Sequence, residues 1–584
     1  MSGSVENYIR LVSEAYEGSL KLPAFQRDFK WNRKQVVLLF DSIRQGYPLN
    51  GMLQIEGNRE EFDGREFFGA ANNAKSVPAR KLILDGQQRI TAGIHLFYNS
   101  PDKLNSQYFI DLNCLEIEIT SAKIDIDDDL AVQNFLSELD VESGYCKARA
   151  KSADPYALLV KSHLLFTPLL LGSNAKKRAG YFEEYIARFP ERKELIRNVI
   201  ESHFIVSSGP TIPLISIEAE FKLDAVSRIF ATLNSSGKVL TPFELVVAVL
   251  YPSKIDLKTA ISDARDANKF YSNMDATGEI ALQTAVIFAD KNPKKSLLPK
   301  TLSASIWTTH GSDAFKWLEE AGKFLTNHLG MALDRTNSLI PYDSIFAPMA
   351  SVMKEIAYPV IQGPQLASVN EKLSRWVVGT AISQRYQEGV HNKQVSDAGA
   401  VADWIKGTSE EPEWLSEVRV PGLTLATPNG ARGRMLRALM NRRKLTDPVN
   451  QKECGVGSAN AQLHHIFPSK FLPKLTGWDS NNDRPNLVLN TMQLDGETNR
   501  AFLHDDPSLQ VAEAARHNPA RYTESYAAQG IDGAALGLLQ KLGKTTVDYK
   551  NFLKLRETYF ESVLGEFGFK KDGSAVDSDD NEEA

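Results

Sequence analysis

The length of the chain, 584 residues, most constrains its fold, because one hydrophobic core rarely serves more than about 250–300 residues. At the usual domain size we expect about three or four structural units. Hydrophobic residues make up 42% of the chain and charged residues 24%, so the collagenous, low-complexity and wholly disordered classes are excluded. The sequence therefore predicts a folded, multidomain protein.

Export and membrane signals are absent from the sequence pattern. The first twenty residues have no apolar export segment, and apolar runs such as residues 245–251 are far shorter than the ~18 residues of a membrane span. Cys114, Cys146 and Cys454 form no C-x-x-C pair, which argues against a disulfide scaffold and against a cysteine-ligated zinc site. We expect a cytoplasmic protein with no membrane partner.

The net charge of -6 at first argues against a nucleic-acid partner, because phosphate binding usually accompanies an excess of basic residues. Six of the 73 acidic residues, however, lie in residues 572–584, which contain no base and no apolar cluster. We interpret this segment as a disordered acidic tail. The rest of the chain is formally neutral, so the overall acidity does not exclude DNA.

A local basic cluster lies in residues 431–444, which contain no acid. Such a charge density suits a surface that faces phosphates, because each contact releases counterions. A solvated helix face explains the same pattern and stays open as an alternative. The DNA-binding candidates are Arg432, Arg434, Arg437, Arg442, Arg443 and Lys444.

Local signals predict several elements of the N-terminal half. Asn32 is a predicted N-cap, and the apolar residues after it recur at helical spacing. Residues 81–98 indicate a strand, an Asp-Gly turn and a helix. Within residues 224–251, Thr241 precedes a proline at the predicted start of another helix. Helical patterns then dominate residues 258–444, which we interpret as a helical scaffold.

The turn D-G-Q-Q-R at residues 85–89 suits an anion. A glycine turn at a helix N-terminus presents backbone N–H groups and the positive end of the helix dipole, and Arg89 adds a bidentate phosphate donor. Asp85 offers oxygen ligands for a cation, and Gln87 or Gln88 could orient a water or read a base. Ordinary turn chemistry stays open as an alternative, because Asp-Gly often precedes a helix.

The most specific pattern is A-Q-L-H-H-I-F-P at residues 461–468, followed by an asparagine-rich stretch. Phosphodiester hydrolysis needs a base that activates water and a divalent cation that holds phosphate oxygens. Neighbouring side chains of a strand point to opposite faces, so two adjacent histidines would divide these tasks. Asn499 is a candidate oxygen ligand and Asn490 a candidate brace of the loop. Imidazole and oxygen ligands suit Mg²⁺ or Mn²⁺.

This pattern resembles the HNH, or ββα-metal, nuclease motif. The resemblance places His465 as the general base and His464 as a metal ligand, at a position where many family members carry Asp. It places Asn490 as the middle asparagine and Asn499 as the final metal ligand. The departure at His464 leaves the preferred metal open.

Three alternatives accompany this assignment. A second register of the motif is available, because Asn486 and Asp495 have the same spacing as the preferred asparagine pair. His504 is a further candidate ligand. A histidine beside an apolar strand is also often a hydrogen-bonded core residue, and asparagine-rich turns are often only turns.

Three N-terminal segments, at residues 22–31, 85–89 and 229–245, together resemble the N-terminal domain of GmrSD-type modification-dependent restriction endonucleases, with their SspE-like and BrxU-like relatives. That domain is similar to the ParB/sulfiredoxin fold. The resemblance implies binding and hydrolysis of a nucleoside triphosphate, either GTP, UTP or ATP. The nucleotide-site candidates that it marks are Gln26, Arg27, Asp85, Gly86, Gln88, Arg89 and Asn234.

The expected fold is α+β, multidomain and mostly helical. Its parts are a ParB-like α/β domain at residues 1–255 with a helical insertion at about 116–210, a helical scaffold at 256–455, an HNH domain at 456–570 and an acidic tail at 571–584. The expected function is an anti-phage endonuclease or nickase that senses modified double-stranded DNA of phage or host. A non-catalytic, nucleotide-gated DNA-binding regulator and an RNA-cleaving toxin are the alternatives. Assembly as a homo-oligomer stays open.

Overall fold

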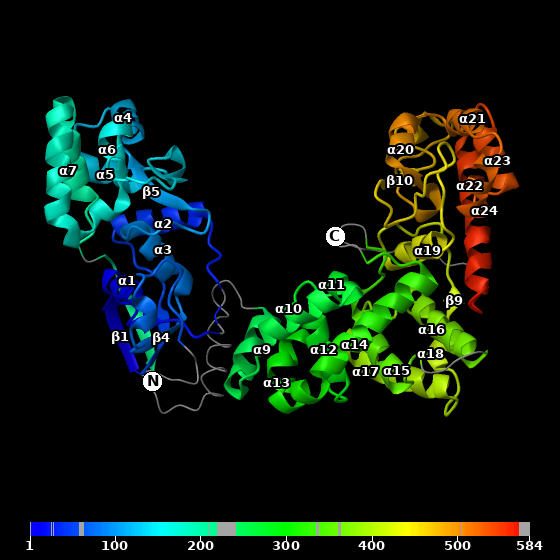
Figure 1. The fold of residues 1–584 in the computed structure, drawn as a ribbon. Helices are drawn as coiled ribbons and strands as arrows, with labels where there is room; N and C mark the ends of the chain where they lie inside the picture. The colour runs from blue at the N-terminus through cyan, green and yellow to red at the C-terminus, as the bar shows by residue number, and fades with distance from the viewer. Residues whose placement is uncertain are drawn as a thin grey trace. The chain divides into compact units, whose positions relative to one another are not determined.

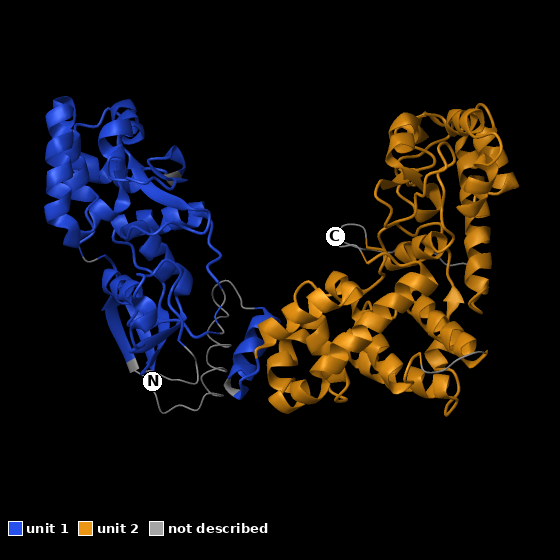
Figure 2. Ribbon diagram, viewed as in Figure 1, with its two compact units in different colours: residues 1–255 blue, residues 256–584 orange. Residues whose placement is uncertain are grey.

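The computed structural model describes residues 2–24, 26, 28–57, 64–207, 209–218, 241–333, 338–359, 364–503 and 505–571. The chain divides into two compact units, Met1–Ile255 and Asp256–Ala584, which Figure 2 distinguishes by colour. The predicted acidic tail from Asp572 onward lies outside the described residues. Within them the fold is α+β and mostly helical, as the sequence predicts.

The first unit contains a mixed sheet in the strand order β1-β8-β3-β4-β2. Strand β3 runs parallel to β8 and antiparallel to β4. Helix α3 packs against both α1 and α2, and side chains from these helices and the sheet share one hydrophobic core (Figure 1). The elements are β1 (Ser2–Asn7), α1 (Tyr8–Glu17), β2 (Leu20–Lys21), α2 (Arg33–Arg44), β3 (Met52–Glu56), β4 (Lys81–Asp85), α3 (Gln87–Phe97), β8 (Thr211–Ile217) and α9 (Pro242–Leu250).

A second sheet, in the order β6-β5-β7, is antiparallel throughout. Two of its strands fall inside the predicted insertion at residues 116–210, so this insertion is mixed rather than purely helical. The sequence pattern missed these strands because they are short: β7 has three residues, and β6 has five, of which two are basic. The elements of this part are β5 (Ser106–Asp111), α4 (Leu112–Ser121), α5 (Asp129–Glu138), β6 (Cys146–Ala150), α6 (Leu158–Ser162), β7 (Leu164–Phe166), α7 (Ala175–Arg188) and a π-helix (Leu195–Glu201).

Two predicted helix starts are confirmed by their caps. The Asn32 side chain accepts from the Gln35 backbone N–H, and the Gln35 side chain accepts in return from the Asn32 N–H. Thr241 and Glu244 form the same reciprocal pair at the start of α9. Each cap satisfies backbone donors that a helix end would otherwise leave without a partner.

The second unit combines a helical layer with the C-terminal segment around one continuous core, which includes side chains from residue 264 to residue 569. The predicted division near residue 455 therefore does not separate two cores. The helices before it are α10 (Leu257–Ala267), α11 (Lys269–Met274), α12 (Glu279–Ile287), α13 (Leu298–Thr301), α14 (Ala304–Leu329), α15 (Phe346–Glu355), α16 (Pro364–Ile382), α17 (Val390–Lys406), α18 (Glu413–Ser416) and α19 (Ala431–Asn441).

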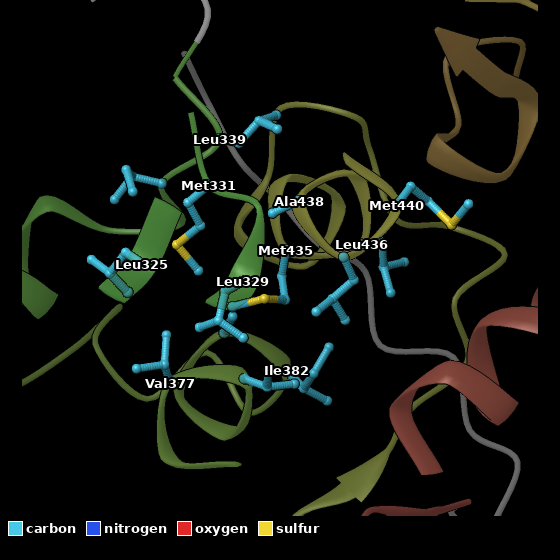
Figure 3. Packing of buried hydrophobic residues seen from close by; sticks show 14 of the residues in the cluster. Leu325, Leu329, Met331, Leu339, Val377, Ile382, Met435, Leu436, Ala438 and Met440 are labelled. Carbon is cyan, nitrogen blue, oxygen red and sulfur yellow. The ribbon is translucent and has the colours of Figure 1, made fainter. Parts of the chain in front are cut away.

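Helix α19 lies inside this core. Figure 3 shows its apolar side chains, among them Met435 and Leu436, beside Leu329 at the end of α14 and Ile382 at the end of α16. The elements that follow are β10 (Ala461–His465), β11 (Thr491–Asp495), α20 (Gly496–Phe502), α21 (Pro507–His517), α22 (Tyr522–Ala528), α23 (Gly533–Gln540) and α24 (Thr546–Gly565), and a short parallel pair joins β9 (Arg419–Val420) to β12 (Lys570–Lys571).

Among the described residues, no helix combines the length and the apolar composition that crossing a bilayer requires.

The buried His95 predicts a pH dependence of the first unit. Its ring is fully buried, Nδ1 lies 3.2 Å from the Ser100 carbonyl oxygen, and burial lowers the pKa to about 4. The unfolded chain, with its ordinary pKa near 6.5, takes up the proton first as the pH falls. Stability is therefore lost between about pH 6.5 and 4, with about 2 kcal/mol lost from pH 7 to 5.

The measurement is urea unfolding at pH 7 and pH 5, with ¹⁹F NMR of fluorotryptophan-labelled protein as the probe of unfolding. Trp31 is the single tryptophan of residues 1–255 and reports on this unit. We expect His95→Gln to lower the stability at pH 7 and to reduce its loss on acidification. An equal loss in both proteins would contradict the assignment.

Candidate functional site

The candidate site is built on two antiparallel strands and the helix that follows them. In β10 and β11, His464 lies opposite Met492 and His465 opposite Thr491. Helix α20 starts directly after β11, where the Asp495 side chain accepts from the Glu497 N–H as the N-cap. The two histidines are consecutive residues of one strand, so their side chains point to opposite faces of the pair.

His464 points inward, with 4% of its surface exposed. Its Nδ1 lies 2.8 Å from Oδ1 of Asn499 in α20, and its Nε2 lies 3.2 Å from Oε1 of Gln510 in α21. Burial lowers the pKa of His464, which favours the neutral imidazole at physiological pH. In the neutral imidazole one ring nitrogen carries the proton and the other keeps its lone pair, which is the form of histidine that binds metals in general.

His465 is partly exposed on the other face. Its Nε2 lies 3.4 Å from Oδ1 of the exposed Asn486. The arrangement gives one histidine access to a bound molecule and keeps the other as a fixed inner group.

Asn490 braces the turn between the two histidines and β11. It is fully buried. Its Oδ1 accepts from the Phe467 N–H at 2.9 Å, and its Nδ2 donates to the carbonyl oxygens of Phe467 and Pro485 at 3.0 and 2.9 Å. These bonds tie the segment after β10 to the segment before β11, which is the bracing role predicted for this asparagine.

Two further residues that sequence analysis missed hold the backbone of this motif. The fully buried Asp447 accepts from the Asp495 N–H and from the Thr498 hydroxyl. The buried Arg556 of α24 donates to the carbonyl oxygens of Leu489, Thr491 and Gln529, and burial lowers its pKa to about 10. Both residues are distant in sequence from the groups that they bind, so no local motif identifies them.

The donor set fits a hard divalent cation. His464 Nδ1 and Asn499 Oδ1 face one another without a thiolate nearby, which suits Mg²⁺ or Mn²⁺ with water and phosphate oxygens as further ligands. Within the part of the chain that the structure describes, no group of three His, Cys, Asp or Glu side chains is placed to hold a metal. A cation here would therefore depend on amide oxygens besides the imidazole.

The second register of the motif has a different place in the structure. Asp495 caps α20 and its carboxylate accepts from the side chains of Asn450 and Asn460, while Asn486 reaches His465 rather than His464. Asn499, the ligand of the first register, is the asparagine beside His464. His504 lies outside the described residues.

The basic cluster of α19 differs from the expected open surface. The guanidinium groups of Arg432, Arg434 and Arg437 are half-buried and donate to the carbonyl oxygens of Ile382, Ile340 and Pro428. Burial lowers the pKa of Arg437 to about 10. These three side chains join segments of the second unit, so their prediction as phosphate contacts conflicts with their positions.

The other three bases of the cluster are exposed. Arg442 and Arg443 lie 3.9 and 3.4 Å from the carboxylate of Glu566, and Lys444 follows them outside the helix. Within residues 461–503, sequence analysis passed over four exposed bases: Lys470, Lys474, Arg484 and Arg500. They were overlooked because they are dispersed and not clustered.

The predicted strand, turn and helix at D-G-Q-Q-R are confirmed as β4, Gly86 and α3. Gly86 has a φ of 105°, and an added Cβ would approach Cγ of Met52 to 2.7 Å, so only glycine fits. No side chain caps α3 at this position. Helix N-termini in general suit anions, because their first backbone N–H groups have no acceptor within the helix.

The side chains around this turn also hold neighbouring loops. Arg89 donates to the carbonyl oxygens of Asn50 and Gly51, and its Nη2 lies 3.6 Å from the Asp85 carboxylate. Gln88 accepts from the N–H groups of Lys30 and Trp31.

Gln26 is buried and donates to the Leu84 carbonyl. Asp85, Gly86, Gln88 and Arg89 are thus brought together with Gln26 at one end of the sheet. Arg27 and Asn234 lie outside the described residues.

Comparison with known proteins bears first on this unit. Residues 8–251 match the family model of the GmrSD restriction endonuclease, N-terminal domain. This match shows that the first unit is similar to a domain of restriction endonucleases. An uncharacterized protein of Methanocaldococcus jannaschii is 24% identical over 547 residues, which cover 88% of this chain and 87% of the relative. This second similarity extends beyond the N-terminal unit.

The position of Asn490 leads to a stability prediction. Asn490→Ala leaves three backbone groups of a buried turn without partners, so we expect a loss of about 3 kcal/mol in the free energy of unfolding. Asn486→Ala, at an exposed position of the same loop, is the matched control and should stay within about 0.5 kcal/mol of the parent. Urea unfolding measures both, and similar losses would refute the bracing role.

Proposed function

We propose that the chain is a metal-dependent endonuclease of the HNH type, in which His465 is the general base and His464 and Asn499 hold the cation. The observation that carries this proposal is the placement of two adjacent histidines on opposite faces of a strand pair, with Asn499 Oδ1 2.8 Å from Nδ1 of the inner one. The similarity of residues 8–251 to a restriction endonuclease domain supports DNA as the substrate.

In the proposed mechanism, the outer imidazole accepts a proton from a water that attacks the scissile phosphorus. His465 is partly exposed and so within reach of a bound strand, while Asn486 at 3.4 Å limits the rotation of its ring. A bound divalent cation supplies stabilisation of the charge that develops on the phosphate and on the leaving 3′ oxygen. Asn490 takes part only as a positioning residue, through the turn that it holds.

DNA contacts are assigned to the exposed bases of the second unit. Lys470, Arg484 and Arg500 lie in or beside the segments that carry the histidine pair, Asn486 and Asn499. Arg442, Arg443 and Lys444 form an additional exposed group. Because exposed guanidinium and ammonium groups bind phosphates without reading sequence, they would serve any strand that the site accepts.

The N-terminal unit is proposed to bind and hydrolyse a nucleoside triphosphate at the Asp85–Arg89 turn and to take part in sensing DNA modification, either sugar-modified cytosine or phosphorothioate. Support comes from the strand, glycine turn and helix that D-G-Q-Q-R forms and from the family match. Asp85, whose side chain is 46% exposed, is the accessible acid beside this helix start.

The first test of the nuclease is His465→Ala. Removing a positioned general base costs about 10²–10⁴-fold in rate, so we expect cleavage of plasmid or phage DNA with Mg²⁺ or Mn²⁺ to fall by this factor. DNA binding and the unfolding midpoint should stay at parental values. His517→Ala, which removes an exposed histidine of α21, is the matched control and should cleave normally.

The same assay separates the alternatives. Unmodified, glucosylated and phosphorothioated DNA are compared with RNA, with and without each nucleoside triphosphate. Cleavage at the parental rate by His465→Ala would exclude His465 as the general base. A preference for RNA would favour a toxin, and binding without cleavage of any substrate by the parent would favour a regulator.

Arg484→Ala should weaken DNA binding and reduce the salt dependence of that binding without altering the unfolding midpoint.

The nucleotide proposal is tested with Asp85→Asn. Titration calorimetry with GTP, UTP and ATP in the presence of Mg²⁺ should show at least a tenfold loss of affinity for the nucleotide that the parent binds. The loss is expected because the substitution removes the carboxylate that would bind the cation of the nucleotide. Glu56→Gln, at an exposed end of the same sheet, is the control and should bind as the parent does. Equal affinities of parent and Asp85→Asn would rule out a role of this acid.

A further inference from the structure

The two amides beside His464 differ in how firmly their orientation is fixed. Gln510 is 3% exposed, and its Nε2 donates to the Asp505 carbonyl oxygen at 3.1 Å. A carbonyl oxygen accepts and never donates, so turning the amide over would set two oxygens against each other. The amide of Gln510 therefore keeps its oxygen toward Nε2 of His464, at 3.2 Å.

The segment that carries the Asp505 carbonyl is itself held. The Asp505 N–H donates to the Phe502 carbonyl, and the next residue, Asp506, caps α21 through the Ser508 N–H. The Asp506 carboxylate is 2.6 Å from the ammonium group of Lys544, whose side chain is fully buried. The acceptor that orients Gln510 thus lies in an exposed segment that these bonds tie to the fold.

Asn499 is held more loosely. Its Nδ2 donates to Oε1 of Gln462 at 2.7 Å, but Gln462 is exposed and bears an amide that can turn over together with that of Asn499. The amide facing Nδ1 of His464 can therefore present either its oxygen or its NH₂ group. One side of the ring has a fixed acceptor, and the other side has an adjustable group.

From this asymmetry we propose that Gln510 is a positioning residue that holds His464 in the tautomer with the proton on Nε2, so that Nδ1 is left as the bare ligand atom facing Asn499. The inference rests on the proposed function, because it assigns which ring nitrogen binds the cation. The ring donates Nε2–H to Gln510, and its Nδ1 lone pair and the Asn499 oxygen converge on one point. A hydrogen bond from the distal N–H of a ligating histidine fixes both tautomer and ring orientation.

The test uses the full chain with ¹⁵N-labelled histidine and long-range ¹H–¹⁵N NMR, in which His464→Gln identifies the signals of this ring. The parent should show a proton on Nε2 of His464. Gln510→Met, which removes the acceptor at similar size, should give a mixture of tautomers. Gln510→Glu, which retains an oxygen acceptor, should restore the Nε2–H form.

Affinity for Mn²⁺, measured by calorimetry and electron paramagnetic resonance without DNA, is the second readout. We expect a 10–100-fold loss in Gln510→Met, recovery to within about threefold of the parent in Gln510→Glu, and no change in the matched control Gln540→Met at an exposed position of α23.

The outcomes separate the two ideas. A parent with the proton on Nδ1 of His464 overturns the inference even if no Gln510 variant folds. Mn²⁺ binding that depends on His464 but is unchanged in Gln510→Met also overturns it and leaves the metal site standing. Mn²⁺ binding that is the same in the parent and in His464→Gln overturns the metal site itself, and with it the proposed function.

Discussion

The candidate site depends on the register of one short strand pair. With His464 opposite Met492 and His465 opposite Thr491, one imidazole enters the protein and the other faces outward. Because side chains alternate along a strand, a slip of one residue would exchange these positions. The register is held from the backbone: Asn490 joins the turns at one end of β11, and Asp447 accepts from the Asp495 N–H at the other. The orientation of the two histidines therefore depends on hydrogen bonds made by Asn490 and Asp447, which we do not expect to contact the substrate.

The inner half of the site consists of neutral groups. Asn490, Asn499 and Gln510 are amides, and the burial that lowers the pKa of His464 keeps its imidazole uncharged as well. Neutral donors and acceptors are less costly to bury than carboxylates when each has a partner. These neutral groups would not balance the positive charge of a bound cation.

The sequence predicted those features that are encoded locally. Asn32 and Thr241 mark helix starts because a cap and its partner lie three residues apart, and the H-H-I-F-P strand and Asn499 lie within forty residues of each other. Gln510, Asp447 and Arg556 could not be found in this way, because they reach the site from other elements and carry no spacing signal. Strands β6 and β7 were missed for a related reason: their partner β5 lies outside the segment that was interpreted as a helical insertion.

The arginines of α19 show why charge density in a sequence is a weak guide to a surface. The first seven residues of this helix include three arginines, yet Met435, Leu436 and Leu439 are buried and the helix lies within the core. An arginine has a long apolar stem, so its head reaches a carbonyl oxygen at the edge of the core while the stem packs inside. Arg434 and Arg437 do this, and the free ends of nearby helices and loops supply the acceptors. Guanidinium groups used in this way stabilise the fold and are withdrawn from phosphate, so the DNA contacts that we propose are assigned to exposed bases outside this helix.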